Sequence, residues 1–305
     1  LVDSKYVVAS LEKGNKTKNI FADNLYKDII DNSSNNSTVF NAVLQNLVDQ
    51  KFPVNDDMKE DAATIIKQIK SAYKSNYGDN YKDSLNQALT SAGYKNLSEY
   101  RQRMIKQIQY ANFLLDYIDD HFDDVFNDYY QQCAPKYVSL IKISVSDTSS
   151  PTDDETSKLN EVKELISNTD KSFGDIAQDY SDDSTSSKKG SLGIVDSKDT
   201  SGIANSYGKD VFNAIEALSE GQVSDVITGD DGYYFVKVTS TDKKTLKKEL
   251  KKTDIDSPLL AYDDYLQYVV YNSYKINYKD KDIKKIVQEV VNKALEERKT
   301  ERGEA

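Results

Sequence analysis

Cysteine, histidine and tryptophan are almost missing from this chain, which contains one, one and none of them in 305 residues. A single thiol, Cys133, excludes a disulfide within the chain and does not by itself define the redox compartment. The single imidazole, His121, lies among four aspartates in the stretch IDDHFDDVF. That setting is typical of a solvated helix face, and it argues against a serine–histidine–aspartate triad and against a transition-metal site.

Long apolar runs and an excess of positive charge are absent as well. The apolar stretches are far shorter than the ~18–20 residues that cross a bilayer, so the sequence predicts no membrane-spanning helix. The chain carries 51 acidic and 40 basic side chains, which gives a net charge of −11. Because nucleic-acid phosphates would repel such a protein, we predict no nucleic-acid partner.

Motifs for cofactors are also missing. The sequence has no glycine-rich phosphate loop, and its acidic runs lack the glycine and the closing glutamate of a calcium loop. The 22 tyrosines suggest carbohydrate binding, but several of them lie at the spacing of helix cores. We therefore predict no metal and no cofactor. The chain starts at Leu1 instead of methionine, and from this we expect that a leader has been removed.

Apolar residues at helical spacing dominate both ends of the chain. They predict that the first 135 residues are helical, with one helix around residues 40–48 capped by Ser37 or Thr38. A further helix is expected around residues 62–73, and a long amphipathic helix over residues 97–118. From residue 242 onward the same spacing returns, and it ends in a helix over residues 283–295.

The middle of the chain shows a different pattern. Residues 137–145 and 233–238 are typical of β-strands, and the polar run over residues 146–157 predicts a loop. Apolar spacing predicts three helices between the two strands, over residues 159–166, 173–177 and 211–218. The middle segment is therefore expected to form an α+β unit.

Two stretches of this middle segment resemble the parvulin class of peptidyl-prolyl isomerases. They are KSFGDIAQDYSDDSTSSKKGSLG, residues 171–193, and GQVSDVITGDDGYYFVKV, residues 221–238, whose fixed spacings agree with that class. Outside them, GYKNLSEYRQRMIKQIQYANFLLDYI and YKINYKDKDIKKIV are similar to the helical regions of PrsA-type foldases and SurA-like chaperones. The resemblance covers nearly the whole chain.

This resemblance implies an α+β fold of two domains. Residues 1–135 and 242–305 would form one all-helical chaperone domain, and residues 136–241 an inserted parvulin-type α+β rotamase domain. An insertion of this kind is possible because the ends of a domain often lie close together at its surface.

The resemblance also assigns positions to a rotamase site. The polar cluster of parvulins has two histidines and an Asp or Cys; in this sequence the histidine positions fall on Leu140 and Tyr234, and the acidic position on Asp183. The family's GGDLG signature reads KGSLG here. The positions that would bind substrate are apolar wall residues and one threonine: Leu192, Val211, Phe212 and Thr228.

The implied function is that of an extracytoplasmic foldase, anchored by lipid to the outer face of a membrane and acting on unfolded or partly folded secreted polypeptides. The resemblance also allows a homodimer. Loss of both imidazoles leaves two interpretations open. In one, Asp183 and the Tyr234 hydroxyl sustain isomerisation; in the other, the domain only binds peptide and the protein is a holdase chaperone. A third class, an adaptor or structural envelope protein, has no feature in its favour.

Overall fold

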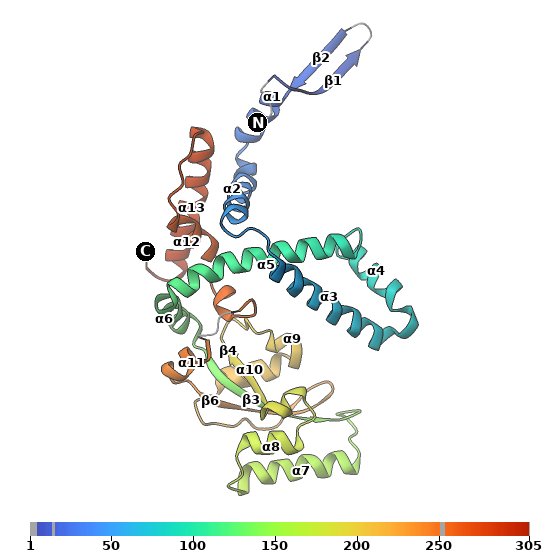
Figure 1. The fold of residues 1–305 in the computed structure, drawn as a ribbon. Helices are drawn as coiled ribbons and strands as arrows, with labels where there is room; N and C mark the ends of the chain where they lie inside the picture. The colour runs from blue at the N-terminus through green and yellow to red at the C-terminus, as the bar shows by residue number, and fades with distance from the viewer. Residues whose placement is uncertain (1–4, 14–15, 251–253, 305) are drawn as a thin grey trace. The chain divides into compact units, whose positions relative to one another are not determined.

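The computed structural model describes residues 5–13, 16–250 and 254–304, and Figure 1 gives the order of their helices and strands. The chain divides into two compact units, one made of residues 1–117 with 264–305 and the other of residues 118–263. The segment predicted as an insertion, residues 136–241, lies inside the second unit. Compactness alone does not define where a domain folds independently, so the predicted domain boundaries stay a prediction.

The first unit is mostly helical and draws its elements from both ends of the chain. Its order is β1 (Val7–Lys13), β2 (Lys16–Phe21), α1 (Ala22–Ile30), α2 (Asn36–Lys51), α3 (Asp56–Tyr77), α4 (Tyr81–Ser91), α5 (Leu97–Asp120, which runs into the second unit), α12 (Leu266–Ser273) and α13 (Lys281–Glu301). The helices predicted around residues 40–48, 62–73, 97–118 and 283–295 are confirmed.

Two small cores hold this unit together. In one, apolar side chains of α3 meet those of α5, among them Met58, Ala62, Ile66, Met104, Ile105 and Ile108. In the other, α2 and α13 lie side by side, and the fully buried Phe40 ring stacks on Tyr268 at 5.0 Å between centroids. The side chain of Asn55 caps α3 by accepting from the Met58 N–H at 2.9 Å.

Two details of the helical prediction are wrong. Helix α2 begins at Asn36, directly after a 3₁₀ turn over Ser33–Asn35, so neither Ser37 nor Thr38 caps it. Val7–Lys13 and Lys16–Phe21 are not helical but form the antiparallel pair β1–β2. β-Branched residues such as Val7 and Val8 pack well on a pleated strand and lose side-chain freedom in a helix, which favours the hairpin.

The second unit is an α+β sandwich around one antiparallel sheet. Its elements are α6 (Phe122–Cys133), β3 (Lys136–Ser144), α7 (Asp153–Asn168), α8 (Phe173–Tyr180), β4 (Ser191–Val195), α9 (Ile203–Tyr207), α10 (Lys209–Ala217), β5 (Ile227–Thr228), β6 (Gly232–Ser240) and α11 (Lys243–Leu250). The strand order is β4-β3-β6-β5. Both predicted strands and all three predicted helices are present, although α7 begins inside the expected loop because Thr152 and Glu155 form a capping box.

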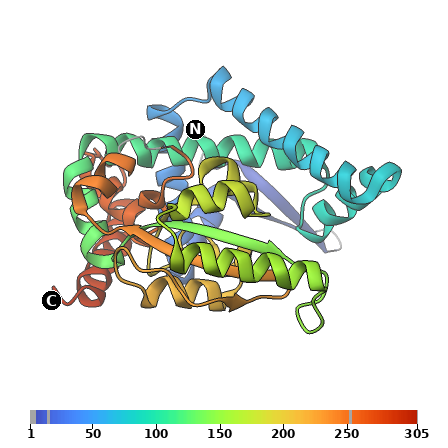
Figure 2. The same cartoon turned by 90° about the horizontal axis from the view of Figure 1, so that it is seen from below.

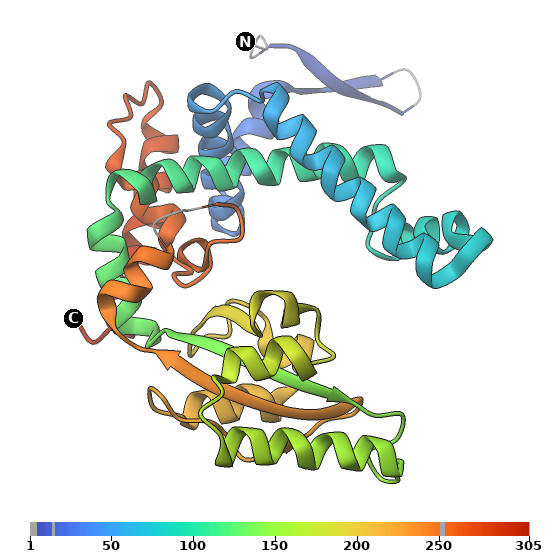
Figure 3. The same cartoon turned by 60° about the horizontal axis from the view of Figure 1, so that its bottom comes forward.

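Strands β3 and β6 carry the sheet, and alternate residues point to its two faces. Figure 2 shows the two strands side by side with α7 in front of them, and Figure 3 gives a tilted view of the same sheet. On one face Leu140 and Val236 pack against α9 and α10. On the other, Ile141 and Phe235 pack against α7 and α8. The first of these faces carries the candidate site.

None of the described helices is both long enough and apolar enough to cross a membrane.

Candidate functional site

A cleft of about 600 Å³ opens in the second unit at one end of the sheet. Its walls come from α9, the start of α10, strand β5 and the turn that precedes β6. Its lining is mainly polar and includes Tyr207, Val211, Ile227, Thr228, Asp231 and Tyr234. The cleft therefore offers a few apolar side chains among polar groups that could orient a bound peptide.

The sheet side of the cleft is built from Tyr234, Asp231 and Lys142. Tyr234 on β6 is 2% exposed, and its hydroxyl donates a hydrogen bond to the Asp231 carboxylate. Lys142 lies opposite Tyr234 on β3, makes an ion pair with Asp231, and places its Nζ 5.6 Å from the centre of the tyrosine ring. Hydrogen bonds from Lys142 and Tyr234 hold the pKa of Asp231 below its usual value. Burial and the neighbouring Asp231 raise the pKa of Tyr234.

The opposite side is built from Asp183 and Tyr207. Asp183 precedes the 3₁₀ helix Ser184–Lys188, and its Oδ1 accepts from the backbone N–H and the hydroxyl of Thr185, at 2.8 and 2.6 Å. Burial raises the pKa of Tyr207, and the negative charge of the nearby Asp183 carboxylate raises it further. The Tyr207 ring meets the Tyr234 ring edge to face, with 6.2 Å between centroids. The hydrogen-bonded pair Tyr234–Asp231 thus lies next to Tyr207, which has Asp183 nearby.

The structure brings some of the predicted site residues together and separates others. Tyr234, Val211 and Thr228 line the cleft, and Asp183 adjoins it through Tyr207. Leu140 has no exposed surface and packs in the core beneath Tyr234, so its side chain supports the cleft without facing it.

The last two predicted residues are not cleft residues. Phe212 and Leu192 are partly buried against the same core. Leu192 also lines a separate hollow on the same unit, together with Tyr137 and Pro258.

Sequence reasoning missed Tyr207, Asp231 and Lys142. Position 142 follows Leu140 by two residues in a strand, and this spacing already places both side chains on the same face. Asp231 belongs to the turn GDDG just before β6, close to the family's second histidine position. Nothing in the local sequence around Tyr207 indicates that it lies near Asp183, because that placement depends on how α9 packs on the sheet.

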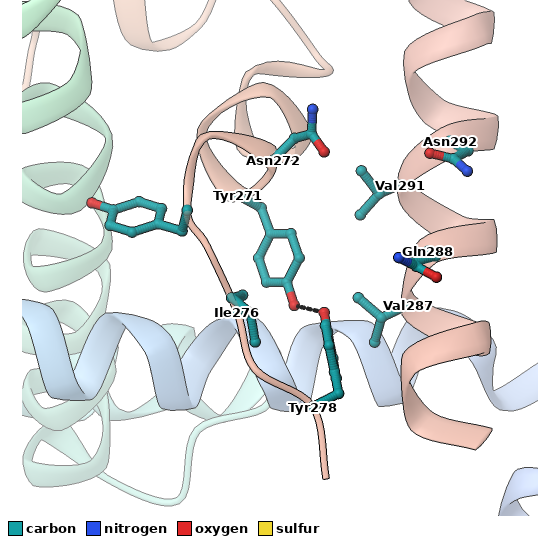
Figure 4. A pocket seen from close by; sticks show the side chains of 9 residues that line it. Tyr271, Asn272, Ile276, Tyr278, Val287, Gln288, Val291 and Asn292 are labelled. Atoms are coloured by element: carbon teal, nitrogen blue, oxygen red, sulfur yellow. Dashed lines mark hydrogen bonds between the residues drawn. The ribbon is translucent and has the colours of Figure 1, made fainter. Parts of the chain in front are cut away.

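A second, smaller pocket of about 170 Å³ lies in the helical unit. Figure 4 shows it between α12 and α13, with Val287 and Val291 on one side and the hydrogen-bonded hydroxyls of Tyr271 and Tyr278 on the other. Burial, together with that hydrogen bond, raises the pKa of Tyr271. Within the described parts of the chain, no group of three or more His, Cys, Asp or Glu side chains is placed to hold a metal ion.

Comparison with known proteins identifies the unit that carries the cleft. Residues 140–240 match the family described as Rotamase: PPIC-type PPIASE domain. Foldase protein PrsA of Staphylococcus aureus is 32% identical to the chain over 141 residues, which make up 44% of this chain and 41% of that protein. Foldase protein PrsA of Staphylococcus epidermidis has the same identity and coverage.

The match spans about two fifths of the length of these curated relatives. Among solved structures, PrsA from Bacillus subtilis aligns with 93% of this chain and 98% of that chain, at 22% identity and a TM-score of 0.41. Residues 140–240 are therefore a parvulin-type rotamase domain, and the chain is homologous to the PrsA foldase proteins.

Proposed function

We propose that this protein is an extracytoplasmic folding factor for unfolded or partly folded secreted polypeptides, and that its rotamase domain isomerises Xaa-Pro bonds without histidine. One observation carries the proposal. In the cleft the apolar side chain of Ile227, packed on the core that contains the buried Val211, lies with the hydrogen-bonded pair Tyr234–Asp231 and with Tyr207, which has Asp183 nearby. The lipid anchor and the homodimer stay predictions.

A catalyst of this reaction needs only a binding site whose shape and electrostatics favour the transition state. Rotation about an Xaa-Pro bond breaks no covalent bond, but it has a barrier of about 18–20 kcal/mol because the planar amide is stabilised by resonance. That resonance places negative charge on the carbonyl oxygen. The twisted transition state has lost the resonance, so its oxygen carries less negative charge. A site that favours the twisted form over both planar forms therefore accelerates the reaction in both directions.

The cleft has the groups for such a preference. The proline ring would lie against Ile227, with the preceding carbonyl directed towards the carboxylates of Asp183 and Asp231. Negative charge close to that oxygen opposes the charge-separated planar amide and costs less energy in the twisted form. The Tyr234 hydroxyl holds the Asp231 carboxylate by a hydrogen bond, and Thr185 holds that of Asp183. Lys142 offsets part of the charge of Asp231.

Removal of the Tyr234 hydroxyl is expected to lower the isomerase rate. Tyr234→Phe keeps the ring in the core and releases Asp231 from one hydrogen bond. Because one such bond contributes about 0.5–1.5 kcal/mol, kcat/KM should fall about 3- to 10-fold. The measurement is the slow phase of refolding of a proline-limited substrate protein in the presence of the full chain.

Tyr233→Phe is the matched control. It removes one hydroxyl from the neighbouring residue, which packs on the opposite face of the sheet. Its rate should equal that of the unchanged protein. If neither variant changes the slow phase and the unchanged chain does not accelerate it, the alternative applies: the domain only binds peptide, and the chain should then suppress aggregation without any isomerase activity.

The isomerase rate is expected to be independent of pH between about pH 6 and 8. Asp231 has a lowered pKa and stays ionised in this range, whereas Tyr207 and Tyr234 have raised pKa values and stay protonated. The single histidine of the chain, His121, lies outside the cleft. The pH profile of kcat/KM measures this directly, and an inflection near pH 6–7 would show that a group outside this set takes part in the reaction.

A further inference from the structure

A groove of about 500 Å³ lies on the helical unit where α3 passes the start of α5. Its floor is apolar and is formed by Ala63, Ile66 and Leu97. Three cationic side chains surround that floor: Lys67 and Lys70 from α3, and Arg101 from α5. All three are exposed at the surface of the unit.

Intramolecular pairing does not account for these three charges. In the part of the chain that the structure describes, none of them forms an ion pair with an acidic side chain. The Arg101 guanidinium makes one long hydrogen bond, from Nη2 to the backbone oxygen of Lys59 at 3.4 Å. The acidic residues of α3 closest in sequence, Glu60 and Asp61, lie nearer its N-terminus and do not line the groove.

Helix stabilisation does not account for them either. Cations stabilise a helix in its last turn, and α3 continues to Tyr77, so Lys67 and Lys70 lie before that turn. Arg101 lies in the second turn of α5, at the end of a helix where the dipole disfavours positive charge. A concentration of unpaired cations is also unexpected in a chain with a net charge of −11.

We propose that this groove binds acidic segments of unfolded polypeptides, in which carboxylates flank an apolar side chain. The cations would pair with the carboxylates, while Ile66 and Leu97 would receive the apolar side chain between them. A bare polyanion would use the charges but leave the apolar floor uncovered, and for this reason we favour a peptide. The inference rests on the proposed function, since it names the class of client segment that the helical unit selects.

The test is binding of a dye-labelled peptide, in which aspartates flank two leucines, to the full chain by fluorescence anisotropy. Two comparison peptides replace the aspartates by asparagines or the leucines by serines. We expect each replacement to weaken binding about tenfold, and an increase in salt from about 0.05 to about 0.5 M to weaken binding of the aspartate peptide. The double variant Lys67→Gln with Lys70→Gln should lose about tenfold in affinity for it.

A matched variant, Lys281→Gln with Lys284→Gln, makes the same change in net charge on α13, away from the groove. It should bind as the unchanged chain does. Equal losses in both double variants would overturn the proposal, because they would show that only the total charge matters. Displacement by inorganic polyphosphate combined with no effect of the leucine replacement would also overturn it, in favour of a polyanion site.

The readout is direct binding, so its failure leaves the isomerase assay unaffected. A chain that accelerates proline-limited refolding but does not bind the aspartate peptide would retain the proposed function and lose this inference.

Discussion

Replacement of Gly190 by alanine is expected to destabilise the rotamase domain by about 2–5 kcal/mol, a large part of the total stability of an ordinary domain. Gly190 has φ +74°, a conformation that costs an L-residue about 1–2 kcal/mol. An added Cβ would also collide with the backbone oxygen of Leu140 and lie 2.9 Å from the Cβ of Ala177. The backbone of β3 cannot move aside without disturbing the sheet, so the clash adds a further ~1–3 kcal/mol.

The position also matters for the site. The Gly190 carbonyl accepts from the Leu140 N–H at 2.8 Å, and its own N–H donates to the Thr185 oxygen at 2.9 Å. Gly190 thereby joins β3 to the 3₁₀ helix that Asp183 begins. A shift here is expected to displace Asp183 and reduce isomerase activity together with stability.

Gly193→Ala provides the control, because Gly193 has nearly the same φ, +79°, with nothing within 4 Å of an added Cβ. This variant should lose only the stability that an L-residue loses at a positive φ, about 1–2 kcal/mol. Urea unfolding followed by hydrogen exchange of the peptides from β3 and β4 separates the rotamase domain from the helical unit. Equal losses for the two variants would show that the close contact with Leu140 is not present in solution.

The second large effect is expected at Asp196, whose side chain is fully buried. Its carboxylate accepts from the Tyr129 hydroxyl at 2.8 Å, from the backbone N–H groups of Lys198 and Thr200 at 3.0 and 3.3 Å, and from the Thr200 hydroxyl. Asp196→Ala leaves the buried Tyr129 hydroxyl without an acceptor and removes three hydrogen bonds of the exposed Lys198 and the partly exposed Thr200. The unsatisfied hydroxyl costs about 1–3 kcal/mol and each of the other lost bonds about 0.5–1.5 kcal/mol, so we expect a total loss of about 3–5 kcal/mol.

Asp196→Ala is also expected to change the structure of the cleft. Asp196 stabilises the turn that leads into α9. In this turn the Asp199 carboxylate accepts hydrogen bonds from the Ile203 and Ala204 N–H groups, at 2.6 and 3.0 Å, at the start of the helix. Helix α9 carries Tyr207, so a loosened turn should weaken isomerase activity too. Asp196→Asn keeps the shape and one acceptor oxygen and should cost about 1–2 kcal/mol. If alanine costs no more than asparagine in urea unfolding, the buried network contributes little.

The sequence predicted the large elements because each repeats a simple pattern. Strands β3 and β6 follow runs of β-branched and aromatic residues, and α5 carries a clear apolar stripe. Strand β5 has two residues and α9 has five, which is too short for any periodicity. The strand β4 contains Gly193, and its pairing with β3 is interrupted by a bulge, so its local sequence gives a weak strand signal.

The site was predictable to the extent that it lies in sequence motifs. Tyr234, Val211 and Thr228 follow from positions relative to the two conspicuous stretches, and the structure places them around one cleft. The proximity of Tyr207 to Asp183 was not predictable, since α9 brings the two residues near each other only by packing on the sheet. Leu140 shows the opposite case. It occupies the position of a site residue in the parvulin class, but the leucine side chain is fully buried in the core.

The measurement that tests the central claim most directly is exchange NMR on a short Ala-Pro peptide, with the full chain added in catalytic amounts. A short peptide neither folds nor aggregates, so chaperone activity cannot change its exchange rate. We expect exchange between the cis and trans signals well above the spontaneous rate, unchanged in Tyr233→Phe and reduced about 3- to 10-fold in Tyr234→Phe. Exchange at the spontaneous rate with the unchanged chain would contradict catalysis by a cleft that has no histidine.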